Sequence, residues 1–171
     1  SRIKSISFME AIVMPMTWDY WPEIARNIFQ LMRSEAGEEI VLEKNIFVER
    51  ILFNDSEKGL SDEAKKEYIR PFKNAGEDRR PTLTWPRQIP IDGSPEAVID
   101  EVTKNGEFHK NSDIPKLFIN ADPGTILIGK QREFVRSWSN LKEVTVKGNH
   151  FVQEDSPHEI GEALKVFIET I

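Results

Sequence analysis

Residues 116–120 read Lys-Leu-Phe-Ile-Asn, a short apolar run with a proline close to each end. Its length and its flanks predict a strand that is buried on both faces. A helical pattern over residues 128–138 comes next, and residues 143–147, Glu-Val-Thr-Val-Lys, then alternate as a strand does. Strand, helix and strand at this spacing predict a parallel sheet. The fold class is therefore α/β.

Further elements flank these two strands. A helix is expected from Ser94-Pro95 to about Lys110. Residues 156–159, Ser-Pro-His-Glu, predict a capping box with proline in the first turn of the last helix. A short β-compatible run over residues 2–9 predicts a third strand, which leads to Glu10. The apolar side of the last helix is expected to hold Ile160, Leu164, Phe167, Ile168 and Ile171.

Residues 13–90 follow a different pattern, in which helices are separated by Pro, Gly and Asn. Helical spacing is expected to place Ile24, Ile28, Leu31 and Met32 on one face. Ser61, followed by two acids, is a predicted helix start. Residues 79–87 hold two prolines, and we expect a hinge or connecting loop there.

The chain is accordingly divided into three parts. Residues 1–12 are a core strand ending at a candidate acid, residues 13–92 an all-α block, and residues 93–171 the α/β part. The opening with Ser1 in place of Met suggests a truncated or processed chain.

Composition excludes several classes of protein. The 171 residues include no cysteine, which removes disulfide scaffolds, cysteine-ligated metals and thiol nucleophiles and suits a reducing, cytoplasmic location. The 23 Lys and Arg against 29 Asp and Glu, net charge −6, argue against nucleic acid or an anionic membrane as a main partner. No stretch approaches the roughly 18 consecutive apolar residues of a membrane span, and no secretory signal is visible.

Candidate catalytic residues follow the strands, because functional groups of parallel sheets collect beyond the carboxyl ends. His150, after Gly-Asn, is suited to be a general base, or else it is a turn histidine. Glu10 is either the acid that orients this base or a strand-end cap. Asp122 competes for that role, although Asp-Pro-Gly favours an ordinary turn. His109 and His158 lie in polar helical surroundings and are expected to be solvated.

Two further observations concern what else a catalytic site would need. No Gly-x-Ser-x-Gly or Gly-x-Asp-x-Gly nucleophile motif exists in the chain, and no metal-ligand spacing is present. Arg79-Arg80 is expected to be a surface or salt-bridged pair without a function. The aromatic side chains of the helical block are core by default, and some are candidates to line an apolar pocket: Trp18, Trp21, Phe29, Phe47 and Trp85.

At this point the sequence resembles a known family, the haloalkane dehalogenases of the α/β-hydrolase fold, and it is also similar to the coelenterazine luciferase of Renilla. The similarity spans nearly the whole chain. It rests on Met9-Glu10-Ala11-Ile12, Trp18, Pro22-Glu23, residues 34–39 (SEAGEE), 45–49 (NIFVE), 79–90 (RRPTLTWPRQIP), 115–121 (PKLFINA) and 150–155 (HFVQED).

The resemblance implies a partial α/β-hydrolase fold: the C-terminal strands and helices of a mainly parallel sheet, plus an inserted all-α cap. It implies hydrolytic dehalogenation, in which an Asp displaces halide and a His-activated water cleaves the resulting ester. His150 would be the base and Glu10 the acid. The nucleophilic Asp would belong to an absent N-terminal half, so this chain alone is expected to be inactive.

The same resemblance implies a substrate site and partners. The partners would be a small apolar halogenated substrate, water, the halide product and the N-terminal half, with no cofactor and no metal. Pro86 would lie nearest the halide. The loop over residues 53–56 is more polar than expected at a tunnel mouth. The apolar cavity would draw on Ile12, Trp21, Phe29, Phe47, Ile51, Pro86, Ile89, Ile126 and Phe151.

Two alternatives remain open. One is a luciferase-type monooxygenase on the same scaffold, and the other is a non-catalytic binding or assembly module made from a truncated hydrolase.

Overall fold

The computed structural model describes residues 2–54 and 56–171. The chain forms two compact units: an α/β unit that comprises the residues up to Pro15 together with Ile99–Ile171, and a helical unit, Met16–Val98. The predicted loop over residues 53–56 includes position 55, which lies outside the described residues. In the described part, no helix has both the length and the apolar character needed to cross a membrane.

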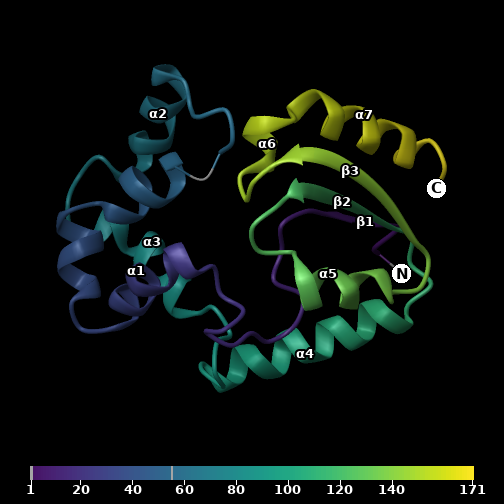
Figure 1. The fold of residues 1–171 in the computed structure, drawn as a ribbon, viewed down its shortest axis with the longest axis horizontal. Helices are drawn as coiled ribbons and strands as arrows, with labels where there is room; N and C mark the ends of the chain where they lie inside the picture. Colours follow the sequence, from purple (N-terminus) through teal and green to yellow (C-terminus); the bar gives the residue numbers. More distant parts are fainter. Residues whose placement is uncertain (1, 55) are drawn as a thin grey trace. The chain divides into compact units, whose positions relative to one another are not determined.

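The α/β unit is built on a parallel three-stranded sheet in the order β1 (Ile6–Phe8), β2 (Lys116–Pro123), β3 (Leu141–Gly148) (Figure 1). Its predicted α/β class and parallel sheet are therefore confirmed. Strand β1 is shorter than predicted, because pairing begins where Ile6 meets Lys116, the first residue of β2. The helices that accompany the sheet are α4 (Glu96–Asn111), α5 (Gly129–Arg136), α6 (Val152–Asp155) and α7 (Pro157–Ile168).

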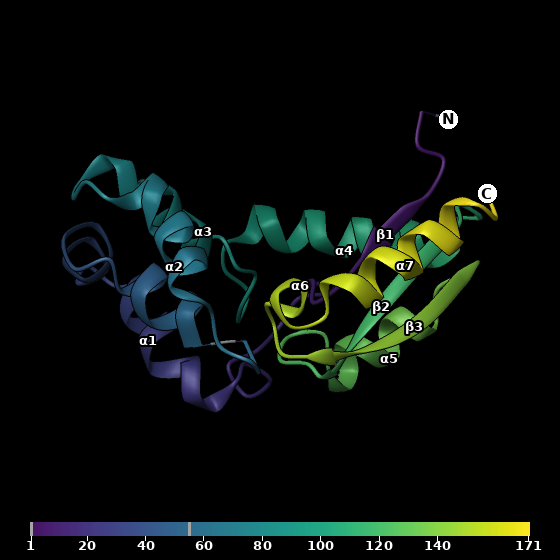
Figure 2. The same cartoon turned by 90° about the horizontal axis from the view of Figure 1, so that it is seen from above.

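Helices cover both faces of the sheet, with α7 on one side and α4 and α5 on the other (Figures 1 and 2). The side chains of successive β2 residues point to opposite faces of the sheet, as they do in any β-strand. Leu117 and Ile119 pack in one buried cluster with Ile160 and Phe167 of α7, whereas Phe118 packs in another with Val135 of α5. The buried apolar run predicted at residues 116–120 is thus the centre of the core.

Lys116 starts β2 and is fully buried. Its ammonium group donates hydrogen bonds to the carbonyls of Ser112, Ile114 and Ser139, at 2.6, 2.8 and 2.9 Å. A buried cation is tolerated when it is hydrogen-bonded, and these bonds close the amino end of the sheet. Burial lowers the pKa of this lysine, and the nearby Asp113 opposes that shift.

The last helix departs from its predicted cap. Ser156 precedes α7, but its hydroxyl makes no capping bond and instead donates to the carbonyl of Lys147, 2.7 Å away. The capping box is therefore not formed, because the hydroxyl is turned toward the end of β3. Ile160 and Phe167 are buried as expected, while Ile168 and Ile171 are exposed.

The helical unit contains helices of several kinds, which confirms an all-α block apart from isolated bridges that join Ile91 to Met16 and to Ser94. Ser61 caps α2 by accepting the N–H of Ala64 at 3.1 Å, as predicted. The helices are α1 (Glu23–Arg33), η1 (Glu38–Glu43), η2 (Phe47–Ile51), η3 (Leu52–Asn54), α2 (Asp62–Ile69), η4 (Arg70–Phe72), η5 (Glu77–Arg79) and α3 (Arg80–Arg87).

Two predictions for the helical unit are wrong. The expected loop over residues 79–87 is mostly helix α3, because Pro81 lies in the first turn, where no N–H is needed, and Pro86 in the last. The apolar face of α1 is also narrower than its spacing indicates. Met32 is buried, but Ile24 and Leu31 are exposed, and Phe29 is the other buried residue of this helix.

Candidate active site

Glu10 lies just beyond the carboxyl end of β1, where a left-handed backbone conformation (φ +41°) turns the chain away from the sheet. This conformation is rare outside glycine, and such positions gather at functional sites. The side chain is only 3% exposed. Its Oε2 atom accepts hydrogen bonds from the backbone N–H groups of Thr125 and Ile126, at 2.9 and 2.8 Å.

Gly124 makes room for this carboxylate. A Cβ atom at this position would lie 2.8 Å from Oε1 of Glu10, closer than side chains approach. The backbone there has φ +70°, which also favours glycine. The Pro-Gly turn after β2 is therefore shaped to receive the acid, and this explains why Thr125 and Ile126 point their N–H groups at it.

His150 follows the carboxyl end of β3 in a turn that is fixed by buried groups. Oδ2 of the buried Asp155 accepts the N–H of Asn149 at 3.1 Å. Gly148 (φ +146°) packs so closely on Asp155 that a Cβ would lie 2.8 Å from that carboxylate. The histidine side chain itself is 23% exposed, so it is held in place yet remains open to solvent.

Glu10 and His150 meet: Nδ1 of the histidine lies 3.4 Å from Oε2 of the acid. Burial alone would raise the pKa of Glu10, but the His150 ring and the N–H groups of Ile126 and Thr125 outweigh it, and the pKa lies below its usual value. The acid is therefore ionised at neutral pH. A carboxylate against Nδ1 orients the ring and leaves Nε2 available to accept a proton, which is the arrangement a general base needs.

Two buried atoms in this pair have no hydrogen-bond partner within residues 2–54 and 56–171: Oε1 of Glu10 and Nδ1 of His150. Native structures leave few buried polar groups unpaired.

The other candidate acid and histidines lie elsewhere. Asp122 is exposed and lies near the end of β2, where it pairs with Lys147, so the strand continues into the expected turn; Glu10 accepts the N–H groups of Thr125 and Ile126, which lie farther along the chain. His158 is exposed as expected. His109 is not simply solvated: its ring packs 5.2 Å from Trp138, and its Nδ1 is buried. Burial, helped by Lys116, lowers the pKa of His109.

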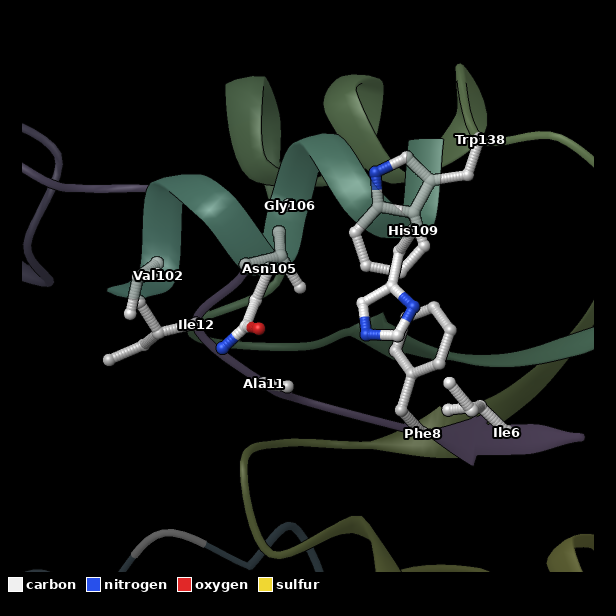
Figure 3. Close-up of a pocket in the computed structure, with 10 residues that line it drawn as sticks. Ile6, Phe8, Ala11, Ile12, Val102, Asn105, Gly106, His109 and Trp138 are labelled. Atoms are coloured by element: carbon white, nitrogen blue, oxygen red, sulfur yellow. The ribbon is translucent and has the colours of Figure 1, made fainter. Parts of the chain in front are cut away.

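Three of the expected cavity residues belong to the α/β unit. Ile126 is buried and holds Glu10 through its N–H, and the ring of Phe151 lies 5.0 Å from that of His150. Ile12 lines a pocket of about 320 Å³ beside β1 and α4, together with His109 and Trp138 (Figure 3). The structure thus brings Ile126 and Phe151 to the acid–histidine pair.

The other six belong to the helical unit. Trp21 and Phe29 are buried and pack with their ring centres 4.7 Å apart. Phe47 is half-buried and packs on the exposed Trp85 at 5.9 Å. Pro86 and Ile89 are buried, and Ile51 is half-buried.

Sequence reasoning missed the groups that hold the acid and the histidine in place. Thr125 and Ile126 act through backbone N–H groups, which no side-chain pattern reveals. Gly124 was visible as part of a Pro-Gly turn, but its close approach to the acid was not. In the described part of the chain, no three His, Asp or Glu side chains gather as a metal site.

Comparisons with known proteins identify relatives of this chain. No family model matches the chain. In sequence it is 50% identical over 167 residues to a haloalkane dehalogenase of Sphingobium indicum strain UT26, which covers 98% of this chain and 56% of the relative. It is 50% identical over 172 residues to the haloalkane dehalogenase of Mycolicibacterium smegmatis, with 99% and 55% covered. Coelenterazine h 2-monooxygenase of Renilla reniformis is 41% identical over 173 residues, with 99% and 55% covered.

A solved haloalkane dehalogenase from Bradyrhizobium elkani superposes with a TM-score of 0.91 at 31% identity, covering 98% of this chain and 59% of that one. An ancestral haloalkane dehalogenase superposes with a TM-score of 0.89 at 35% identity, and the match covers 97% of this chain and 60% of that one. The chain therefore has a partial α/β-hydrolase fold. It is a relative of the haloalkane dehalogenases, and both predicted resemblances are confirmed. It spans little more than half the length of the curated relatives it matches.

Proposed function

We propose that this chain, completed by the rest of the fold, hydrolyses haloalkanes to an alcohol and halide. The observation that carries the proposal is the pairing of buried Glu10 with partly exposed His150 beyond the carboxyl ends of β1 and β3. The similarity to haloalkane dehalogenases supplies the reaction class.

The proposed reaction has two steps, and the pair of Glu10 and His150 serves the second. A carboxylate from the other part of the fold attacks the carbon bearing the halogen, so a C–O bond forms and halide leaves with the electron pair. His150 then takes a proton from water, and the water oxygen attacks the ester carbonyl. The intermediate then collapses: the C–O bond to the leaving oxygen breaks, protonated His150 returns its proton to that oxygen to give the alcohol, and the carboxyl group loses its remaining proton to solvent to restore the carboxylate. Glu10 stabilises the imidazolium that forms on His150.

We assign the apolar site to the side chains predicted from the sequence. Dry walls favour displacement of halide from an apolar carbon, and one aimed donor can stabilise the departing ion. Within the helical unit, buried Trp21, Phe29, Pro86 and Ile89 supply such walls, with half-buried Phe47 and Ile51. Ile12, Ile126 and Phe151 are the proposed contributions of the α/β unit. We place Pro86 nearest the halide.

The remaining part of the fold is the proposed partner, and the edge of β1 is where it would bind. In the described residues β1 pairs with β2 alone, which leaves edge N–H and C=O groups to pair. The pocket beside this edge has Phe8, His109 and Trp138 in its wall (Figure 3). Nε1 of Trp138 and Nδ1 of His109 are buried without a partner in the described structure. We also keep a cytoplasmic location as a proposal, supported by the absence of cysteine.

The test is halide release from a 1-bromoalkane, by a chain that carries its upstream sequence, with His150→Phe as the control. We expect release that disappears in the variant, while the 171-residue chain alone releases none. No release from a folded, completed protein would overturn the proposal.

One second candidate is supported by a specific finding, the 41% identity to coelenterazine h 2-monooxygenase. Light emission with coelenterazine, without halide release, would favour it. A completed protein that turns over neither compound would instead favour the non-catalytic module.

A further inference from the structure

Arg132, in α5, binds both ends of the turn that receives Glu10. Its Nε donates to the carbonyl of Leu127 at 3.1 Å, and its Nη2 donates to those of Ala121 and Pro123, at 3.0 and 3.1 Å. These carbonyls lie on either side of the amides that hold the acid. A planar guanidinium, with several donors in a fixed fork, can span such a set.

Gly124 lies between this guanidinium and the carboxylate. The Cβ position of Gly124 is 2.8 Å from Oε1 of Glu10 and 3.1 Å from Nη2 of Arg132. Because glycine has no Cβ, the guanidinium and the carboxylate both approach the space that a side chain at position 124 would fill. Any movement of the turn away from Arg132 would therefore carry the Thr125 and Ile126 amides away from Oε2 of Glu10.

The neighbouring residue of α5 fixes the chain on the other side of the acid. Gln131 is buried, and its Oε1 accepts the N–H groups of Val13 and Met14 at 2.9 and 3.2 Å. Its Nε2 donates to the carbonyl of Met14 at 2.8 Å. Two adjacent side chains of one helix thus hold the segment after Glu10 and the turn that binds its carboxylate.

We propose that Arg132, with Gln131 beside it, is a positioning residue that holds the amides of Thr125 and Ile126 on the carboxylate of Glu10. The importance of this role for turnover rests on the proposed function. The placement itself does not, and it is tested on the 171-residue chain without substrate. The activity assay and the placement assay can therefore fail independently.

The experiment follows the titration of the Glu10 side-chain carboxyl by ¹³C NMR and the hydrogen exchange of the Thr125 and Ile126 amides. In Arg132→Ala we expect the pKa of Glu10 to rise by about one pH unit, since hydrogen bonds to its charged form weaken. Exchange of the two amides should quicken by about tenfold. Arg136→Ala is the matched control, because Arg136 lies in the same helix and pairs only with Glu143 in the described structure.

Arg132→Lys separates geometry from charge, because it keeps the positive charge but loses the fork. The proposal expects Arg132→Lys to raise the pKa of Glu10 and to quicken exchange nearly as much as Arg132→Ala. His150 and Arg132 are the ionisable side chains beside the Glu10 carboxylate and its turn, so each titration is repeated in the His150→Phe background.

Three outcomes decide the matter. A raised pKa with faster exchange in both variants supports positioning. A lysine variant that behaves as the parent would overturn it in favour of a plain charge effect, and so would unchanged exchange in a folded alanine variant. If Arg132→Ala does not fold, Arg132→Lys gives the same two readouts.

Discussion

The two units satisfy their backbone groups in different ways. In the α/β unit the parallel ladder of β1, β2 and β3 pairs the backbone, and buried side chains are left to fix a few turns around Glu10 and His150. The helical unit has only isolated bridges in the residues described, and its short helices end often. Each helix end leaves carbonyls without partners. Arginine side chains bind many of them.

Three arginines do this in the helical unit. Arg33 donates to the carbonyls of Pro86, Ile89 and Ser94, each at 2.9 Å. Arg87 donates to those of Met32 and Ser34. The difference shows that a unit without a sheet can rely on a few long side chains to hydrogen-bond its free carbonyls. The stability of such a unit should be sensitive to single substitutions of these side chains.

Arg79 offers the largest test of this difference. It is buried, and it donates to the carbonyls of Leu42, Glu43, Phe72 and Lys73. Arg79→Ala would leave these carbonyls without that donor, so we expect the free energy of unfolding to fall by about 3 kcal/mol. Urea unfolding followed by circular dichroism measures this.

Arg70→Ala is the control for Arg79. Arg70 is 74% exposed and pairs with Glu67, so its loss should change the free energy of unfolding by less than about 0.5 kcal/mol. Equal effects of the two substitutions would refute the idea that buried arginines hold this unit.

Arg79 also shows why part of the fold was beyond sequence reasoning. Arg79-Arg80 was interpreted as a surface or salt-bridged pair, and Arg80 does pair with Glu38 and Glu77. Nothing in the local sequence separates the two arginines, because burial of Arg79 depends on carbonyls more than thirty positions away. The strands of the α/β unit, by contrast, were predictable from local alternation and apolar runs.

Gly124 gives the next largest effect, in the α/β unit. Gly124→Ala places a Cβ against Oε1 of Glu10 at a left-handed backbone position, and we expect a loss of about 2–3 kcal/mol. Gly59 is a matched control, since its φ of +72° is nearly the same and no described atom lies within 4 Å of its Cβ position. Gly59→Ala should cost only about 1 kcal/mol.

The difference between the two alanine variants isolates the contact with the acid. Thermal unfolding measures both, and NMR of Glu10 should show a perturbed carboxyl only for Gly124→Ala. If both variants lose the same free energy of unfolding and the Glu10 carboxyl is unperturbed, the turn must move to accommodate the added Cβ. Gly124 would then be required only for its backbone conformation.

Unfolding at acid pH tests a smaller contribution to stability, that of the Glu10 carboxylate. The pKa of Glu10 in the folded chain lies below 4.5, its ordinary value, so its contribution to stability is complete above about pH 4.5 and is lost as pH falls through the folded pKa. Glu10→Gln should therefore flatten the acid limb of the stability profile. Urea unfolding between pH 3 and pH 6 tests this, and an unchanged slope would contradict it.

The candidate site shows the same limit of prediction as the fold. Glu10 and His150 could be named because each follows a strand, and parallel strands bring their carboxyl ends to one edge. The amides of Thr125 and Ile126 and the fork of Arg132 could not be named, since they act through backbone geometry set by packing. His109 was expected to be solvated, but its contact with Trp138 depends on how α4 packs in the tertiary structure.

Two serines at predicted helix starts give the smallest effects and the closest comparison between the units. Ser61 accepts the N–H of Ala64, whereas Ser156 donates to the carbonyl of Lys147. Ser61→Ala should cost about 1 kcal/mol and quicken amide exchange in the first turn of α2, and Ser61→Asp should restore the cap because its carboxylate also accepts.

Ser156→Ala should lower the free energy of unfolding by a similarly small amount, but it should loosen a different part of the structure. Its hydroxyl joins the start of α7 to the end of β3, so its loss should quicken exchange around Gly148 and Asn149 and leave the first turn of α7 unchanged, because no cap is lost there. Amide exchange by NMR resolves the two sites. If exchange instead quickened in the first turn of α7, the hydroxyl would be acting as the cap that the sequence predicted, and the turn carrying His150 would have to be held by Asp155 alone.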